Sequence, residues 1–294
     1  MPYSLLTNSL AKEGLSNILE ISRWSAQNGF QALEVGPTVP LSFEECAKAK
    51  AETGVTIEAL TYCRNFLSTD EDEANAHIAE LKRRIGLAGE LGIGLIVTST
   101  GIDKTLEEGV YDRADSIRRI PERSLDKVAR IFTPIIQLAE KNSVKIAFEN
   151  CPLMGNIAIS PDMWAKLFAV LDSKNVGLTF DPSHLHWQFI NPYTALNDFA
   201  DKIFHFHAKD TVIYKEKLEK SGFLTDFKWW EYKIPGDGEL DWKKLMEILK
   251  ISNYKGLISI EHEDAAWEGS LKLVQDGLIK SREYLENIEL GREE

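Results

Sequence analysis

The feature that most constrains the fold is a regular alternation of short apolar segments with longer amphipathic segments. Short apolar runs bounded by turn residues are typical of buried strands, and apolar residues every three or four positions are typical of helices packed on a core. We predict eight strands, at Tyr3–Leu6, Ala32–Val35, Thr56–Thr61, Ile93–Thr98, Val144–Glu149, Val176–Phe180, Lys202–His207 and Leu257–Glu261. We predict helices after them near Glu13–Asn28, Ser42–Thr53, Asp70–Leu91, Ser124–Lys141, Ser160–Leu171, Tyr193–Phe199, Asp241–Ile251 and Gly269–Leu285.

Eight strand–helix units favour one particular architecture. Helices between successive strands favour parallel pairing, and eight such units predict an α/β fold, a closed (β/α)8 TIM barrel. The chain has 294 residues, enough for one such barrel or for two smaller domains. No linker or low-complexity stretch interrupts it, so we expect a single domain over residues 1–294. The alternative is a doubly wound open sheet, but no Gly-rich phosphate turn follows the first strand.

The connections that lead into strands differ in length from the connections that follow strands. Those that lead from a helix to a strand are short and carry Gly or Asn, as at Asn28-Gly29. Those that follow strands are long, notably at Tyr62–Thr69, Ser99–Arg123, Asn150–Ile159 and Asp210–Leu240. A barrel builds its active site from the loops after its strands, so we expect the site there.

Composition excludes several classes of function. Lys and Arg number 34 against 46 Asp and Glu, a net charge of −12, which argues against a nucleic-acid partner. No stretch approaches the roughly 20 apolar residues of a membrane span, and the amino terminus has no signal-peptide pattern, so we expect a cytoplasmic location and no membrane partner. The three cysteines, Cys46, Cys63 and Cys151, have no C-x-x-C spacing, which argues against a disulfide framework or a zinc ribbon.

The last four strands each end on a side chain that can bind a metal ion: Glu149, Asp181, His207 and Glu261. In a parallel barrel the carboxyl ends of the strands meet at one mouth. Three carboxylates and one imidazole suit Mn²⁺ or Mg²⁺, and also Co²⁺ or Zn²⁺. Carboxylates clustered without a cation would repel each other, so we interpret these residues as ligands of one divalent ion rather than as unrelated polar strand ends.

Two neighbours share the inward face of these strands, because strand side chains alternate. His205 lies one layer deeper than His207, and we interpret it as a hydrogen-bonded core histidine rather than a ligand. Glu263 lies beyond the end of the last strand and is the alternative to Glu261 in the ligand set.

Residues next to the ligand set are candidates for substrate binding. The turn after Asp181 brings His184 over the mouth, where it binds substrate or serves only as a cap. Lys209 lies two residues past His207 and would supply a cation to an oxyanion or a sugar hydroxyl; the alternative is a solvated loop lysine. Aromatic residues in the next connection, Trp230 among them, suit the apolar faces of sugars. They could equally pack against the barrel or a partner subunit, which makes a homo-oligomer possible.

Five segments together resemble a known group: Glu149–Pro152, Asp181–His184, His207–Asp210, Ile234–Trp242 and Ser259–Asp264. They are similar to the xylose isomerase-like TIM-barrel superfamily, within it the sugar phosphate isomerase/epimerase group. The resemblance implies one divalent metal, most often Mn²⁺, bound by the four ligands named above. It implies that Glu149 and Glu261 also exchange protons on opposite faces of the substrate, and that His184 binds substrate.

Two departures from the superfamily's patterns narrow the function. The third and fourth strands end near Tyr62 and Thr98 without the extra histidines of the endonuclease IV branch, which argues against DNA repair. The arginine that ketose epimerases carry after the seventh-strand histidine is absent, and Lys209 or Lys233 is the candidate to replace it in substrate binding.

The leading hypothesis is a metal-dependent isomerase or epimerase acting on a small carbohydrate. It would remove a proton next to a carbonyl group and stabilise the resulting enediolate. The alternative is a lyase or dehydratase that then eliminates a β-leaving group from a keto-sugar or cyclitol. A third hypothesis is a carbohydrate-binding barrel without catalysis.

Overall fold

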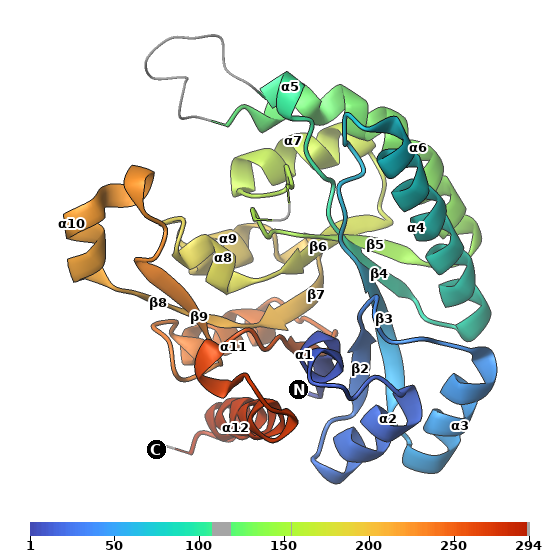
Figure 1. The fold of residues 1–294 in the computed structure, drawn as a ribbon, viewed down its shortest axis with the longest axis vertical. Helices are drawn as coiled ribbons and strands as arrows, with labels where there is room; N and C mark the ends of the chain where they lie inside the picture. Colours follow the sequence, from blue (N-terminus) through green and yellow to red (C-terminus); the bar gives the residue numbers. More distant parts are fainter. Residues whose placement is uncertain (108–118, 154, 293–294) are drawn as a thin grey trace. The chain divides into compact units, whose positions relative to one another are not determined.

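The computed structural model describes residues 1–107, 119–153 and 155–292 and contains the predicted barrel (Figure 1). The hydrogen-bonded strand order, β1-β10-β7-β6-β5-β4-β3-β2, closes on itself and confirms the TIM-barrel prediction. All eight predicted strands are present within two residues of the expected bounds. They are β1 (Tyr3–Leu6), β2 (Ala32–Val35), β3 (Thr56–Tyr62), β4 (Leu95–Thr98), β5 (Lys145–Glu149), β6 (Val176–Phe180), β7 (Ile203–Ala208) and β10 (Ile258–Ile260).

Contacts divide the chain into two compact units, one made of Met1–Glu58 with Phe180–Glu294 and the other of Ala59–Thr179. In the first unit, β7, β10, β1 and β2 are parallel neighbours, and His207 lies opposite Ser259. In the second unit, β3 to β6 are parallel neighbours, and Glu149 lies opposite Thr179. Strand interiors are buried on both faces, as expected when helices cover a parallel sheet.

Helices follow the strands in both units. The first unit contains α1 (Asn8–Lys12), α2 (Ile18–Gln27), α3 (Phe43–Thr53), α8 (Pro182–His186), α9 (Pro192–Asp198), α11 (Trp242–Ile251) and α12 (Leu271–Glu289). The second contains α4 (Glu71–Leu91), α5 (Lys104–Glu107), α6 (Leu125–Lys141) and α7 (Pro161–Leu171). Within the described residues, no helix is at once long enough and apolar enough to cross a membrane.

Local chemistry explains where α3 begins and ends. The Ser42 hydroxyl accepts a hydrogen bond from the Glu45 amide at 3.2 Å, which satisfies a free N–H group in the first turn of α3. The same helix ends at Gly54, whose φ of +74° lies in the left-handed region that glycine adopts without strain.

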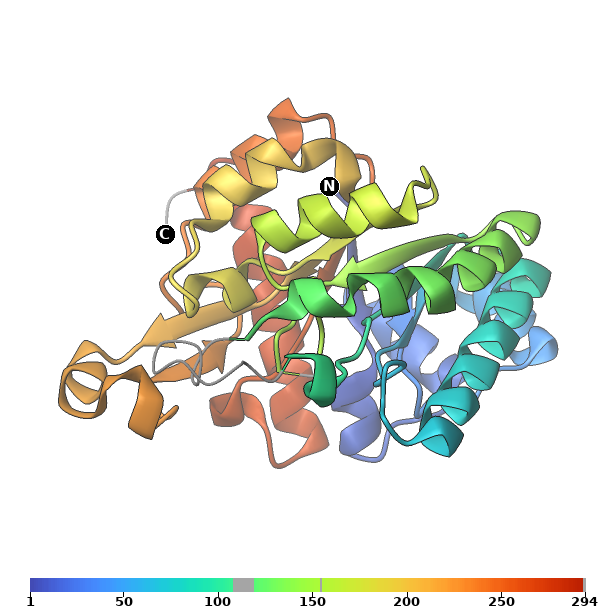
Figure 2. The ribbon, with the colours of Figure 1, turned by 90° about the horizontal axis from the view of Figure 1, so that it is seen from above.

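The connection after β7 differs from the prediction of one long loop. It folds into an antiparallel hairpin of β8 (Asp210–Ile213) and β9 (Trp230–Lys233), with α10 (Lys215–Thr225) between the strands. Figures 1 and 2 show this hairpin in orange, extending beyond the end of β7. Its own small core of Ile213 and Trp229 packs with Trp187. Because that core forms with a residue distant in sequence, local patterns did not indicate it.

Candidate active site

Three of the predicted metal ligands converge in the first unit, each at or just after the carboxyl end of a strand. His207 lies in β7, Glu261 follows β10, and Asp181 follows β6 as the N-cap of α8. Their side chains are 0 to 8% exposed. One oxygen or nitrogen atom of each lies within 4.8 Å of the others. The Nδ1 atom of His207 is 2.9 Å from the Oε2 atom of Glu261.

Charge within this cluster is balanced by Lys209, whose side chain is fully buried. Its Nζ atom lies 3.2 Å from Asp181 Oδ2, 3.0 Å from Glu261 Oε2 and 2.8 Å from Glu263 Oε2. Burial alone would lower the pKa of Lys209, but the nearby carboxylates, Asp181 first, raise it well above its usual value. Lys209 is therefore a fixed cation at neutral pH, and its burial contradicts the alternative of a solvated loop lysine.

The ammonium group of Lys209 has the opposite effect on Asp181. Burial by itself would raise the pKa of this carboxyl group, but Lys209, and after it His184 and His207, lower it below its usual value. Asp181 is thus an anion at neutral pH. Its Oδ1 atom accepts a hydrogen bond from the Ser183 amide at 2.8 Å, which caps α8 and fixes the carboxylate.

His184 lies beside the ligand cluster, as the turn after Asp181 predicts. Its Nε2 atom is 3.3 Å from Asp181 Oδ2 and 3.4 Å from Lys209 Nζ. Its Nδ1 atom is 2.9 Å from the hydroxyl oxygen of Tyr232, which comes from β9. The Tyr232 ring also lies 4.4 Å from Lys209 Nζ. Sequence reasoning did not single out Tyr232, because the hairpin that delivers it was expected to be a loop.

The two other predicted substrate-binding residues belong to the same hairpin. The Trp230 ring stacks on the Trp187 ring, with centroids 4.6 Å apart. Lys233 Nζ lies 3.3 Å from Asp264 Oδ1 and 3.3 Å from a carboxylate oxygen of Glu231. Both side chains therefore have protein partners, and their contact with substrate stays a prediction.

Glu149 ends β5 in the second unit, and its side chain is buried. The thiol of Cys63 donates to its Oε2 atom at 3.7 Å. The Asn156 side-chain amide donates to the Glu149 backbone carbonyl at 2.5 Å, which fixes the chain where the strand ends.

Sequence reasoning missed Glu34, a fully buried carboxylate in β2. Its Oε2 atom lies 2.8 Å from His205 Nε2 and 2.9 Å from His207 Nε2, and it accepts a hydrogen bond from Ser259 Oγ at 2.7 Å. The prediction that His205 is a hydrogen-bonded core histidine is confirmed. The available signal was one acidic residue inside the apolar strand Ala32–Val35.

The donor set fits a divalent cation. Asp181 and Glu261 offer hard carboxylate oxygens, and His207 offers an imidazole nitrogen within the same 4.8 Å cluster. Mn²⁺, Mg²⁺, Co²⁺ and Zn²⁺ all accept such ligands. Glu263, the alternative to Glu261, is half-exposed and contacts Lys209, which favours Glu261 in the ligand set.

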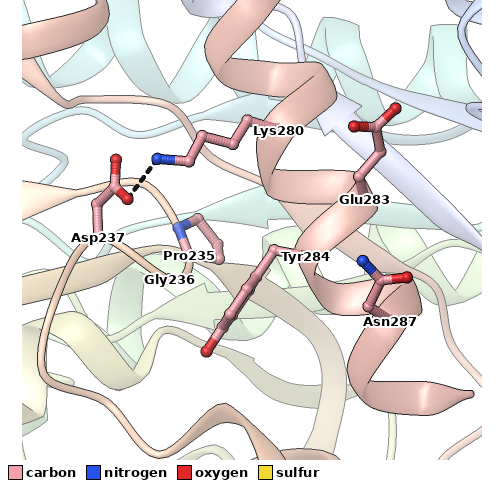
Figure 3. Close-up of a pocket in the computed structure, with 7 residues that line it drawn as sticks. All are labelled: Pro235, Gly236, Asp237, Lys280, Glu283, Tyr284 and Asn287. Atoms are coloured by element: carbon pink, nitrogen blue, oxygen red, sulfur yellow. Dashed lines mark hydrogen bonds and ion pairs between the residues drawn. The ribbon is translucent and has the colours of Figure 1, made fainter. Parts of the chain in front are cut away.

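A separate hollow of about 260 Å³ lies beside α12 (Figure 3). Lys280 pairs with Asp237 at 2.5 Å across it. Gly236 has a φ of +96°, and a Cβ atom there would lie 2.9 Å from the ring of Tyr284. This glycine therefore lets the turn pack against α12. None of the candidate site residues lines the hollow.

Comparisons with known proteins agree with this architecture. A family model described as "Xylose isomerase-like TIM barrel" matches residues 22–287. An inosose dehydratase of Clostridium beijerinckii is 29% identical over 268 residues, which cover 87% of this chain and 85% of that protein.

Two solved structures share the fold. A D-tagatose 3-epimerase-like protein has a TM-score of 0.73 at 23% identity, covering 99% of both chains. The IOLI protein, solved with a bound zinc atom, has a TM-score of 0.73 at 20% identity, covering 98% of this chain and 99% of that one.

Proposed function

We propose a function for this chain, which belongs to the xylose isomerase-like TIM-barrel family. It is an enzyme that modifies a sugar or sugar derivative, and the proposed reaction is the dehydration of a keto-polyol such as an inosose. The observation that carries the proposal is the 3.0 Å separation between Glu261 Oε2 and Lys209 Nζ, both buried. A carboxylate base beside a fixed cation suits elimination next to a carbonyl group. The inosose dehydratase relative supports the same reaction.

The ligands proposed for one divalent ion, with Mn²⁺ the first choice, are Glu149, Asp181, His207 and Glu261. Glu149 lies opposite Thr179 in the register of β5 and β6, and Asp181 is two residues beyond Thr179. Alternation then directs both carboxylates to the same side of the sheet. When bound, the ion would polarise the substrate carbonyl and lower the energy of the negative charge that develops on its oxygen.

Two residues of this chain, Glu261 and Lys209, carry out the proposed dehydration. The Glu261 carboxylate removes the proton from the carbon next to the carbonyl, and the Lys209 ammonium donates a hydrogen bond to the β-hydroxyl. The carbon–oxygen bond then breaks, and Glu261 returns its proton to the departing hydroxyl, which leaves as water. Lys209 stays protonated throughout, in agreement with its raised pKa. His184, held by Tyr232, binds a substrate hydroxyl.

The second candidate is isomerisation or epimerisation, which begins with the same proton removal. It is favoured by Glu149, a second buried carboxylate at a strand end. In this reaction Glu149 and Glu261 act as base and acid on opposite faces of the reacting carbon. The substrate keeps all its oxygen atoms.

Product analysis separates the two reactions. The purified protein is incubated with Mn²⁺ and either an inosose or a ketohexose, and ultraviolet absorbance and product mass are recorded. Dehydration gives an unsaturated carbonyl product that absorbs in the ultraviolet and is lighter by one water; epimerisation gives neither change. Absence of turnover with both substrate classes, in protein shown to contain metal, would contradict an assignment to these substrates.

Glu149→Gln and Glu261→Gln test the proton-transfer roles. In variants shown to hold metal, we expect Glu261→Gln to lower kcat by about 10²–10⁴-fold, the range typical of a lost general acid or base. Glu149→Gln has an effect of that size only if the reaction is epimerisation. Glu283→Gln, at an exposed position on α12, is the control and keeps normal activity. Near-normal turnover by either metal-loaded site variant would exclude that residue from proton transfer.

A further inference from the structure

Next to the ligand cluster lies a group of buried polar side chains that shares only His207 with it. It consists of Glu34 from β2, His205 and His207 from β7, and Ser259 from β10, each at most 1% exposed. The four come from three strands that β1 joins into one parallel sheet. Ser259 and His205 lie two residues before Glu261 and His207, so they share the inward face one layer deeper in the barrel.

The hydrogen bonds of this group converge on the Glu34 carboxylate. His205 Nε2, His207 Nε2 and Ser259 Oγ all lie within 2.9 Å of its Oε2 atom. An ionised carboxylate only accepts hydrogen bonds, so each imidazole must carry its proton on Nε2 to satisfy the contact. Three donor groups at one oxygen atom fit an ionised carboxylate, which has no proton of its own to place there.

The hydrogen bond to Glu34 determines which ring nitrogen of His207 can bind a metal ion. With the proton on Nε2, a neutral ring has a lone pair on Nδ1, and Nδ1 lies 2.9 Å from Glu261 Oε2, on the side of the ligand cluster. We propose that Glu34 is a positioning residue that fixes His207 in the Nε2-protonated tautomer and so presents Nδ1 to a divalent cation. This inference rests on the metal-dependent function proposed above. A carboxylate behind a ligating histidine orients the ring and strengthens its binding of metal.

The same three side chains, Glu34, His205 and His207, could instead hold a second metal ion, since their donor atoms also lie within 4.8 Å of one another. The hydrogen-bond distances favour positioning, because 2.8–2.9 Å is the usual separation for a charge-assisted N–H···O bond. Metal stoichiometry distinguishes the two arrangements.

The variant Glu34→Gln tests whether Glu34 fixes the tautomer of His207. Both carboxylate oxygens lie near His207 Nε2, Oε1 at 3.1 Å and Oε2 at 2.9 Å. In either orientation, the amide of Gln therefore replaces one of these two acceptor oxygens by an NH₂ group and removes the negative charge. The Nε2–H group of His207 then has a weaker acceptor, so the proton shifts toward Nδ1 and blocks the ligand atom. The matched control is Glu58→Gln, a second carboxyl group in this interior, which bonds to the Ser4 hydroxyl instead.

The first readout is the histidine tautomer in metal-free protein, from ¹⁵N-histidine NMR of a chain with six histidines. The His207 signals are assigned by comparison with His207→Asn. We expect the Nε2-protonated form in the wild type and in Glu58→Gln, and a shift toward Nδ1–H in Glu34→Gln. An Nδ1-protonated His207 in the wild type overturns the proposal, whatever reaction the enzyme catalyses.

The second readout is the Kd for Mn²⁺, measured by calorimetry without substrate. We expect Glu34→Gln to bind Mn²⁺ about 10–100-fold more weakly than the wild type, and Glu58→Gln to bind it normally. Equal affinity of all three proteins overturns the proposal. Two ions per wild-type chain with one lost in Glu34→Gln would make Glu34 a ligand and also overturn it. Failure of the dehydration assay alone leaves both readouts intact and contradicts only the proposed reaction.

Discussion

Glu58 is the clearest case in which the interior of this molecule changes the chemistry of a single residue. It lies on β3, where its carboxyl group bonds to the hydroxyl of Ser4. Burial raises its pKa from 4.5 to about 7, although His205 opposes the rise. Nearby Glu34 stays ionised because two imidazoles contact it. The pKa values of these two glutamates thus shift in opposite directions, because two imidazoles are within hydrogen-bond distance of Glu34 whereas Glu58 accepts from the hydroxyl of Ser4.

This difference predicts a pH-dependent stability. Because the folded-state pKa of Glu58 is raised, its contribution to stability is complete below about pH 4.5 and is lost as the pH rises through about 7. We expect Glu58→Gln to remove this dependence, so that its free energy of unfolding relative to wild type rises by about 1–3 kcal/mol from pH 4.5 to 7.5. Urea unfolding across this range measures it, with exposed Glu44→Gln as control. Parallel pH profiles for Glu58→Gln and wild type would contradict the raised pKa.

Lys209 gives a second prediction at this scale. Lys209→Met removes the hydrogen-bond donor proposed for the leaving hydroxyl, so we expect kcat to fall by about 10²–10⁴-fold in metal-loaded protein. Lys243→Met, at an exposed position on α11, is the control and retains activity. Steady-state kinetics with metal content measured in parallel checks this. Full activity in Lys209→Met would leave Lys209 with a purely structural role.

Among the elements, the β8–β9 hairpin contributes most to the site beyond what local patterns indicated. It carries Tyr232 to His184 and Lys209, and the stack of Trp230 on Trp187 holds it in place. Its antiparallel register places Thr211 opposite Tyr232. The aromatic residues predicted to bind sugars therefore differ in their burial. Trp229 is buried in the hairpin's core, whereas Phe223 and Phe227 are exposed.

A single hydroxyl on this hairpin tests its role. Tyr232→Phe removes the 2.9 Å contact with His184 Nδ1 and leaves the ring in place. Because His184 is proposed to bind substrate, we expect KM to rise about 10-fold, the effect of losing roughly 1.4 kcal/mol of binding, with a smaller change in kcat. Tyr214→Phe is matched, since its hydroxyl contacts Glu231 in the same hairpin at 2.8 Å, away from His184. Equal kinetics for both variants would exclude a role of the Tyr232 hydroxyl in substrate binding through His184.

For the whole molecule, the metal ligands belong to elements far apart in sequence, so the unfolded chain has no such site. A ligand that binds only the folded state stabilises it by about 2.7 kcal/mol at 100 times its Kd. We expect Mn²⁺ to raise Tm, with about one ion bound per chain by elemental analysis. Asp181→Asn should abolish both effects while its Oδ1 still caps α8. Exposed Asp201→Asn is the control, and a Tm insensitive to every divalent ion would contradict the metal centre.

Three features could be predicted from the sequence: the eight strands, the order of the helices that follow them and the convergence of Asp181, His207 and Glu261. These follow from local periodicity and from the rule that parallel strands end at one mouth, which need no knowledge of register. Three other features of the site depend on tertiary contacts: the contact of Glu34 with His207, the burial of Lys209 among carboxylates and the contact of Tyr232 with His184. Alternation along a strand says which side chains point inward, but not which of them meet. That depends on register between strands up to 173 residues apart and on a hairpin whose core includes a residue from another element.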